Sequence, residues 1–108
     1  MENYSVVYTD EALQDLRNIY EYISVELKAP KTAAAQVRRI RDEVRSLETL
    51  PRRYRCVDWE PWATMELRQL PVNRFVAFYL VKDAAKSVQI FRILYGKRDL
   101  PNAMTGSR

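Results

Sequence analysis

Apolar side chains recur at helical spacing through the first half of the chain. Their spacing of three and four residues predicts an amphipathic helix over residues 10–28, and Thr9 supplies a candidate N-terminal cap. Pro30 suits the first turn of a second helix, whose apolar stripe runs from Ala33 until Pro51 ends it. Because only a very short loop separates the two helices, we expect an antiparallel helical hairpin.

Four other segments show the residue types and the alternation of β-strands. They are residues 4–8, 64–70, 74–81 and 88–95. The third segment is almost entirely apolar, as in a central strand that is covered on both faces. Alternation in the last segment predicts that one face carries Val88, Ile90, Arg92 and Leu94.

The order of these elements predicts the fold class. One strand, two helices and three strands indicate an α+β fold, with an N-terminal strand and a helix hairpin packed on one face of a mostly antiparallel four-stranded sheet. The opposite face of the sheet is then expected to be uncovered. We expect a single domain over residues 1–100 and a short, flexible tail over residues 101–108.

Residues 51–62 have no clean period and are expected to form a long ordered loop. Arginines and aromatic residues alternate there, as they do on surfaces that bind single-stranded nucleic acid. The alternative is that the aromatic residues cover the core beneath the loop. The residues concerned are Arg52, Arg53, Arg55, Tyr54, Trp59 and Trp62.

The composition removes several classes of chemistry. The 108 residues include no histidine, one cysteine and two isolated glycines. Zinc sites of the Cys/His type, Ser-His-Asp triads and Gly-rich phosphate loops are therefore excluded, and we expect no metal and no cofactor. No apolar run reaches the roughly 18 residues of a membrane span, and the first residues lack the features of a secretory signal. We therefore expect a cytoplasmic protein without a membrane partner.

Charge is distributed unevenly along the chain. Residues 1–29 hold two basic and six acidic side chains, whereas residues 30–108 hold sixteen basic and eight acidic ones. Most of the basic residues are arginine, the side chain best suited to bidentate phosphate contacts and to stacking on bases. This distribution fits either a solvated basic surface or a surface that binds nucleic acid or an acidic protein.

The most informative local feature is a group of cations and a phenol at the ends of the last two strands. Arg74 begins one strand, and Tyr95, Lys97 and Arg98 lie at the end of the next. These side chains should converge, because the start of one strand lies beside the end of the other in an antiparallel hairpin. Cations so placed can grip a phosphodiester, and a phenol or lysine beside them can transfer a proton. The alternative is that Arg74 and Arg98 pair with nearby aspartates and only hold the turn.

Four stretches follow one another in an order and spacing that is similar to a known superfamily. They are VYTDEALQDL at 7–16 with Ile19, Tyr22 and Ile23; Pro30 with 33–40, Leu47 and Pro51; RFVAFY at 74–79; and IFRILYGKRD at 90–99. Over about residues 4–100 the chain resembles the RelE/ParE superfamily of type II toxin–antitoxin toxins. The resemblance implies a small bacterial toxin that a cognate antitoxin protein neutralises by wrapping around it.

The RelE-like branch of this superfamily cuts mRNA in the ribosomal A site, with the RNA 2′-hydroxyl as nucleophile. The resemblance implies that Arg74 and Arg98 bind phosphate, that Tyr95 is catalytic, and that Lys97 is a further catalytic candidate. Some RelE-like enzymes carry a lysine pair on the second strand, where this chain has Glu66 and another arginine, so Glu60 or Glu66 becomes the candidate general base. The candidate RNA-binding residues are Arg68, Arg92, Arg52, Arg53 and Arg55.

The ParE-like branch binds DNA gyrase and is not known for nuclease activity. The ending Gly96-Lys97-Arg98-Asp99 fits this branch equally, and Trp59, Trp62 and Arg53 are then the contact candidates. A third alternative is an inactive module that keeps only the antitoxin interface. Of these, the sequence analysis favours a metal-independent, ribosome-dependent mRNA endoribonuclease that inhibits translation.

Overall fold

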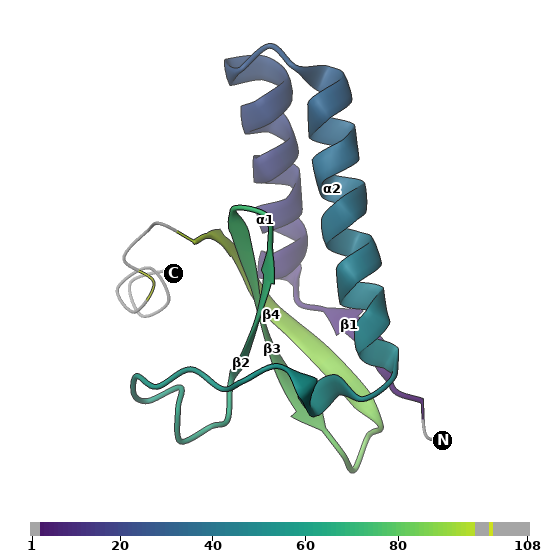
Figure 1. Cartoon of the computed structure of the whole chain (residues 1–108), viewed down its shortest axis with the longest axis vertical. Coiled ribbons are helices and arrows are strands. Elements are labelled where there is room, and N and C mark those ends of the chain that lie inside the picture. Colours follow the sequence, from purple (N-terminus) through teal and green to yellow (C-terminus); the bar gives the residue numbers. More distant parts are fainter. Residues whose placement is uncertain (1–2, 97–99, 101–108) are drawn as a thin grey trace.

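The protein forms a helical hairpin on one face of a four-stranded sheet (Figure 1). The computed structural model describes residues 3–96 and Leu100. The strands are β1 (Ser5–Tyr8), β2 (Arg68–Val72), β3 (Phe75–Lys82) and β4 (Ser87–Tyr95), and the helices are α1 (Asp10–Glu21) and α2 (Pro30–Arg45). The sheet order is β1-β4-β3-β2, with β1 parallel to β4 and the other pairs antiparallel. The α+β prediction is confirmed, while the predicted tail over residues 101–108 lies outside the described residues.

The helix α1 begins with a side-chain cap and ends in a widened turn. The Thr9 hydroxyl accepts a hydrogen bond from the Ala12 amide, as the sequence predicts. The expected single helix over residues 10–28 is wrong at its end, because α1 stops at Glu21 and Tyr22–Glu26 form a π-helical turn. Lys28, with φ of 54°, then reverses the chain toward α2.

The helix α2 begins at Pro30 as predicted, since a proline in the first turn sacrifices no helical hydrogen bond. It ends at Arg45 instead of reaching Pro51, and a 3₁₀ turn over Ser46–Glu48 follows. The Arg53 guanidinium donates to three backbone carbonyls within residues 46–50 and so holds the segment that follows the helix. No helix in the described part of the chain has the length and apolar character to cross a lipid bilayer.

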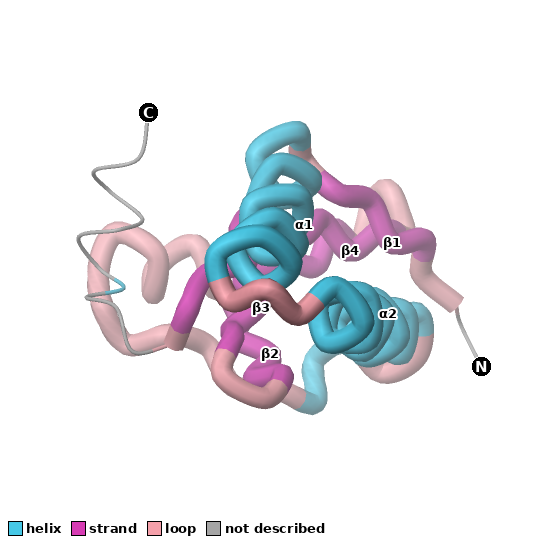
Figure 2. The backbone as a smooth tube through the Cα atoms, turned by 90° about the horizontal axis from the view of Figure 1, so that it is seen from above, coloured by secondary structure: helices cyan, strands magenta, loops and turns pink. Residues whose placement is uncertain are grey.

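The two helices lie side by side over the sheet, with β1 and β2 at opposite edges (Figure 2). The main core fills the space between them. Its fully buried members include Ala33 and Ile40 of α2, and Val88 and Ile90 of β4.

Strand β2 begins at Arg68, later than the predicted Thr64. Glu66 has a φ of 61°, so the chain turns at this residue and the preceding segment cannot continue the strand. The outer edge of β2 pairs instead with the loop, because the Val57 amide donates to the Leu67 carbonyl and the Gln69 amide donates to a carbonyl at residue 55.

A β-bulge in β4 changes the predicted faces of this strand. Phe78 lies opposite Arg92 and Tyr79 lies opposite Ile90, so one residue, Phe91, has no partner on β3. The extra residue reverses the alternation. Val88, Ile90 and Ile93 therefore join the core under the helices, whereas Leu94 faces the other side of the sheet. The prediction that Leu94 shares a face with Val88 and Ile90 is wrong for this reason.

The second face of the sheet is covered, which corrects the expectation of an open face. Phe78, Leu80 and Leu94 form a second core cluster there with Val57 and Leu67. The loop before β2 supplies the cover, and its two tryptophans pack against this cluster. The buried apolar area explains why a segment without any sequence period is nevertheless ordered.

Candidate functional site

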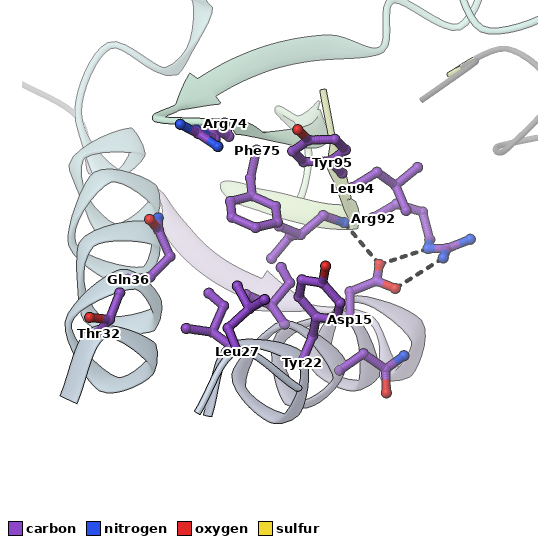
Figure 3. A pocket seen from close by; sticks show the side chains of 14 residues that line it. Asp15, Tyr22, Leu27, Thr32, Gln36, Arg74, Phe75, Arg92, Leu94 and Tyr95 are labelled. Carbon is purple, nitrogen blue, oxygen red and sulfur yellow. Dashed lines mark hydrogen bonds and ion pairs between the residues drawn. The ribbon is translucent and has the colours of Figure 1, made fainter. Parts of the chain in front are cut away.

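A cavity of about 730 Å³ lies between the helical hairpin and the sheet corner where β3 begins and β4 ends (Figure 3). Most of its wall is apolar, from side chains of α1, the segment that follows it, β3 and β4, whereas α2 contributes the polar residues Thr32 and Gln36. The apolar residues include Ile19, Ile23, Leu27, Phe75, Ile93 and Leu94. The volume is in the range of ordinary ligand pockets, and its position places Arg74 and Tyr95 on its wall.

Arg74 and Tyr95 come together as the strand pairing predicts. Phe75 lies opposite Tyr95, their ring centres are 5.9 Å apart, and the Gly96 amide donates to the Arg74 carbonyl at 2.8 Å. A Cβ atom at Gly96 would lie 3.3 Å from that carbonyl oxygen, so the close approach favours glycine. The Arg74 side chain is exposed and has no carboxylate partner among the residues that the structure describes. Lys97 and Arg98 lie outside the described residues.

The turn that carries Arg74 is fixed to helix α2. Asn73 has a φ of 56°, a conformation that asparagine tolerates better than most residues, and it forms the tight β2–β3 turn together with Arg74. Its side-chain amide donates to the Gln36 amide oxygen at 3.2 Å. The contact between the turn and α2 sets the distance between Arg74 and the helical wall of the cavity.

Arg92 forms a nearly buried ion pair with Asp15 of α1 (Figure 3). Its Nε and one terminal nitrogen donate to the two Asp15 oxygens at 2.7 and 3.0 Å, and the Ile93 amide donates to Asp15 at 2.9 Å. The hydrogen bond to Asp15 raises the pKa of Arg92 further above its usual value. Arg92, which the sequence analysis assigns to RNA binding, therefore joins α1 to the bulged part of β4.

The arginines of the loop also contact other parts of this chain. Arg52 forms a bidentate pair with Asp83, which lowers the pKa of that carboxyl group, and Arg53 holds the end of α2. Arg68 donates to two backbone carbonyls in residues 52–54. Arg55 is exposed. Arg68 and Arg74 lie at opposite ends of β2, which at about 3.3 Å per residue spans roughly 16 Å.

Neither candidate general base lines the cavity beside Arg74. The Glu60 carboxylate accepts a hydrogen bond from the Thr64 amide at 3.0 Å. Glu66 borders a separate hollow of about 280 Å³ together with Arg52 and Arg68. Across the described residues, acidic and cysteine side chains form no group of three that could hold a metal ion.

The loop tryptophans pack on the sheet, as the core-covering alternative predicts. Trp59 meets Phe78 edge-on with ring centres 6.0 Å apart, and Trp62 meets Phe91 at 5.0 Å. Both tryptophans are only partly exposed. The exposed aromatic and aliphatic side chains around the cavity are instead Tyr22 and Leu27, which sequence reasoning assigned to the apolar stripe or left without a role.

Comparison with known proteins identifies the family. Residues 6–100 match the family model described as the ParE toxin of the type II toxin–antitoxin system parDE. The chain belongs to the ParE toxin family. No curated protein matches the sequence. The prediction of a RelE/ParE superfamily toxin is confirmed.

Three solved structures of toxin–antitoxin systems resemble this chain. A chromosomal ParDE toxin–antitoxin system from Pseudomonas aeruginosa is similar at 29% identity and a TM-score of 0.70, over 85% of this chain and 95% of that chain. The RelBE2 complex from Mycobacterium tuberculosis shares the fold at 20% identity and a TM-score of 0.63, over 88% of this chain and 93% of that chain. A RelE–RelB complex from Pyrococcus horikoshii shares the fold at 16% identity and a TM-score of 0.60, over 89% of this chain and 98% of that chain. This ParE-family chain is thus a type II toxin–antitoxin toxin of the ParE/RelE kind.

Proposed function

We propose that this toxin acts by binding a protein, DNA gyrase, and that a cognate antitoxin neutralises it by covering the cavity beside Arg74. The observation that carries this proposal is the chemistry of the cavity. Arg74, which has no carboxylate partner within the described part of the chain, stands beside a mostly apolar wall, and Tyr22 and Leu27 are more than half exposed next to it. Exposed aromatic and arginine side chains beside an apolar pocket are typical of the centres of protein–protein interfaces.

The arginines proposed for RNA binding offer much less to a nucleic acid. Arg92 is paired with Asp15, Arg52 is paired with Asp83, and Arg53 and Arg68 donate to backbone carbonyls. An RNA groove needs several cations that can reach consecutive phosphates. All four side chains already serve contacts within the chain, and Arg52, Arg53 and Arg68 lie near the end of β2 that is far from Arg74. They therefore do not supply a continuous track to Arg74. The ParE family match supports the same target.

A ribosome-dependent endoribonuclease is the second candidate, and one observation favours it. Arg74 and Tyr95 line the same cavity at an exposed corner, where a phosphate contact and a proton-transfer group could serve one site. Under this candidate Lys97 and Arg98 complete the site. Both targets, gyrase and the ribosome, place the toxin in the bacterial cytoplasm.

The test compares the two targets with matched variants. The purified toxin is added to a gyrase supercoiling assay and, separately, to a translating extract in which primer extension detects mRNA cuts. We expect supercoiling to be inhibited and mRNA to remain intact. Arg74→Ala and Tyr22→Ala should each weaken inhibition by at least about tenfold, as interface centres do, whereas Arg55→Ala and Tyr20→Ala should not. Arg55 and Tyr20 are exposed residues of the same types outside the cavity.

The outcomes separate the candidates. Cut mRNA with unaffected supercoiling, abolished by Arg74→Ala, would replace the gyrase proposal with the endoribonuclease. If the wild-type chain neither inhibits supercoiling nor cuts mRNA, the third alternative, an inactive module that only binds the antitoxin, is supported. Growth should stop when the chain is expressed alone and recover when the adjoining small gene is co-expressed, and normal growth on strong expression alone would contradict the toxin assignment.

A further inference from the structure

Part of β4 has an edge that no strand in the described part of the chain covers. β1 pairs with β4 only from Ser87 to Ile90, whereas β4 continues to Tyr95. From residue 91 onward, the side of β4 that faces away from β3 has lost its neighbouring strand. A strand without a neighbour presents amide and carbonyl groups that need partners.

Helix α1 satisfies the first part of this edge. The Thr9 amide donates to the Ile90 carbonyl at 3.0 Å, and its hydroxyl donates to the Phe91 carbonyl at 2.9 Å. Asp15 then accepts from the Ile93 amide. The side chains at the start of α1 therefore take the place of β1 as far as the Ile93 amide.

The last part of the edge is open. The Gly96 amide bonds to Arg74, so the next residue pair, Phe75 and Tyr95, is a non-hydrogen-bonded pair of the ladder. In such a pair the backbone groups point away from the partner strand. The Tyr95 amide and carbonyl and the Ile93 carbonyl thus face outward, and none has a partner among the residues that the structure describes.

This open edge borders the cavity. Ile93, Leu94 and Tyr95 line it, and Asn18 of α1 and Tyr22 of the π-helical turn line it from the other side (Figure 3). The edge supplies backbone hydrogen-bonding groups, and the adjoining wall supplies apolar contacts for alternate side chains. Together these are the two requirements for recognition by strand addition.

We propose that an extended segment of the antitoxin adds to the sheet beside residues 93–95, with its backbone bonded to Tyr95 and an apolar side chain in the cavity. The inference rests on the proposed function, because the partner is the antitoxin of this toxin. Charge complementarity defines the segment further. Arg74 is exposed without a carboxylate partner in the described chain, so an acidic residue of the segment pairs with it.

Amide hydrogen exchange tests the pairing directly. The probe is the protein encoded by the small gene next to this one, added to the full-length toxin. The Tyr95 amide should exchange rapidly in the free toxin and become protected on binding, by at least about tenfold. The Ile93 amide is the internal control, because Asp15 already accepts from it and it should be protected in both states.

A matched pair of variants tests the same bond by affinity. Tyr95→Pro removes the outward amide hydrogen and costs the β3–β4 ladder no hydrogen bond, while Tyr95→Ala removes only the side chain. Tyr95→Pro should bind the partner on the order of tenfold more weakly than Tyr95→Ala. Thermal unfolding of both free variants shows whether each is folded.

Each result decides the proposal. A partner that binds without protecting the Tyr95 amide overturns the strand addition while leaving the toxin–antitoxin assignment intact. If folded Tyr95→Pro and Tyr95→Ala bind the partner with equal affinity, the strand addition is likewise overturned and the toxin–antitoxin assignment stands. A partner that neither binds nor restores growth overturns the proposed antitoxin and the strand addition together. If Tyr95→Pro is unfolded, the exchange of the wild-type Tyr95 amide alone decides.

Discussion

Removing the Asp15 carboxylate should destabilise the toxin more than removing any exposed acid of the helices. Asp15 is 7% exposed and accepts three hydrogen bonds, two from Arg92 and one from the Ile93 amide. Asp15→Ala leaves a nearly buried guanidinium without its counter-charge and a buried amide without an acceptor. Breaking such a pair by removing one partner typically costs about 3–5 kcal/mol. A domain of this size has a total stability of about 5–15 kcal/mol.

Chemical denaturation and thermal unfolding measure this loss. A decrease of about 3 kcal/mol should lower the melting temperature by about 12 °C or more. Asp42→Ala is the matched control, because Asp42 lies on α2 in an exposed pair with Arg45, with the Asp42 side chain 55% exposed. That pair is of the kind that contributes about 0.2–0.5 kcal/mol. Adding Arg92→Ala to Asp15→Ala should cost little more, since the two residues act as one unit.

The reasoning would be refuted by a loss of less than about 1 kcal/mol for Asp15→Ala, comparable to the Asp42 control. Such a result would mean that water or a neighbouring group replaces the carboxylate without cost. It would also remove the energetic argument that the Asp15–Arg92 pair stabilises the fold.

Two further predictions concern stability. Burial raises the pKa of Tyr79 to about 12 although Arg68 opposes the shift, and its hydroxyl donates to the Pro51 carbonyl at 2.6 Å. The protonated phenol is therefore favoured in the folded state, so stability that is intact below pH 10 should fall by about 1–2 kcal/mol as the pH rises from 10 to 12. Urea unfolding across this range should show the fall in the wild type and not in Tyr79→Phe. Trp59→Ala should cost about 2 kcal/mol because its ring covers Phe78, as urea unfolding measures, and an unchanged stability with lost toxicity would instead assign Trp59 to the target interface.

The sequence predicts the helical hairpin well because its signals are local. The apolar stripe, the Thr9 cap and Pro30 each act within a few residues, and each is found where expected. The π-turn at Tyr22–Glu26 escapes such reasoning, because the same apolar stripe fits either helix type. Residues 46–48, which the apolar stripe fits equally as α-helix, instead form a 3₁₀ turn, and Arg53 binds the Ser46 and Thr49 carbonyls there from outside the helix.

The sheet is predicted less completely because its errors depend on pairing. Alternation counts residues along one strand and cannot detect the extra residue Phe91, so the face of Leu94 is predicted wrongly. The cover of the second face comes from a loop without a period, and only its three-dimensional path brings Trp59 and Trp62 to the sheet. The hairpin connection, by contrast, is enough to predict that Arg74 lies beside Tyr95.

The roles of the arginines depend on contacts between distant parts of the chain. Asp15 and Arg92 are 77 positions apart, and Arg52 and Asp83 are 31 apart. Nothing in the local sequence of Arg92 or Arg52 separates a structural guanidinium from one that is available to RNA or protein. Composition therefore gives the excess of basic residues and cannot say which of these charges already pair within the chain.

The pairing of the first strand with the last one determines when the toxin can fold during its synthesis. β1 needs β4 as a neighbour, α1 is joined to β4 through Thr9 and Asp15, and the Ser5 amide bonds to the Lys86 carbonyl. A growing chain that has not yet released β4 from the ribosome lacks one wall of the cavity, the Arg74–Tyr95 corner and the open edge beside it. Such a fold, rich in contacts between its two ends, forms slowly and only near the end of translation. Under the proposed function, the surface that the antitoxin covers and the surface that contacts the target therefore form together, only after β4 has been synthesised.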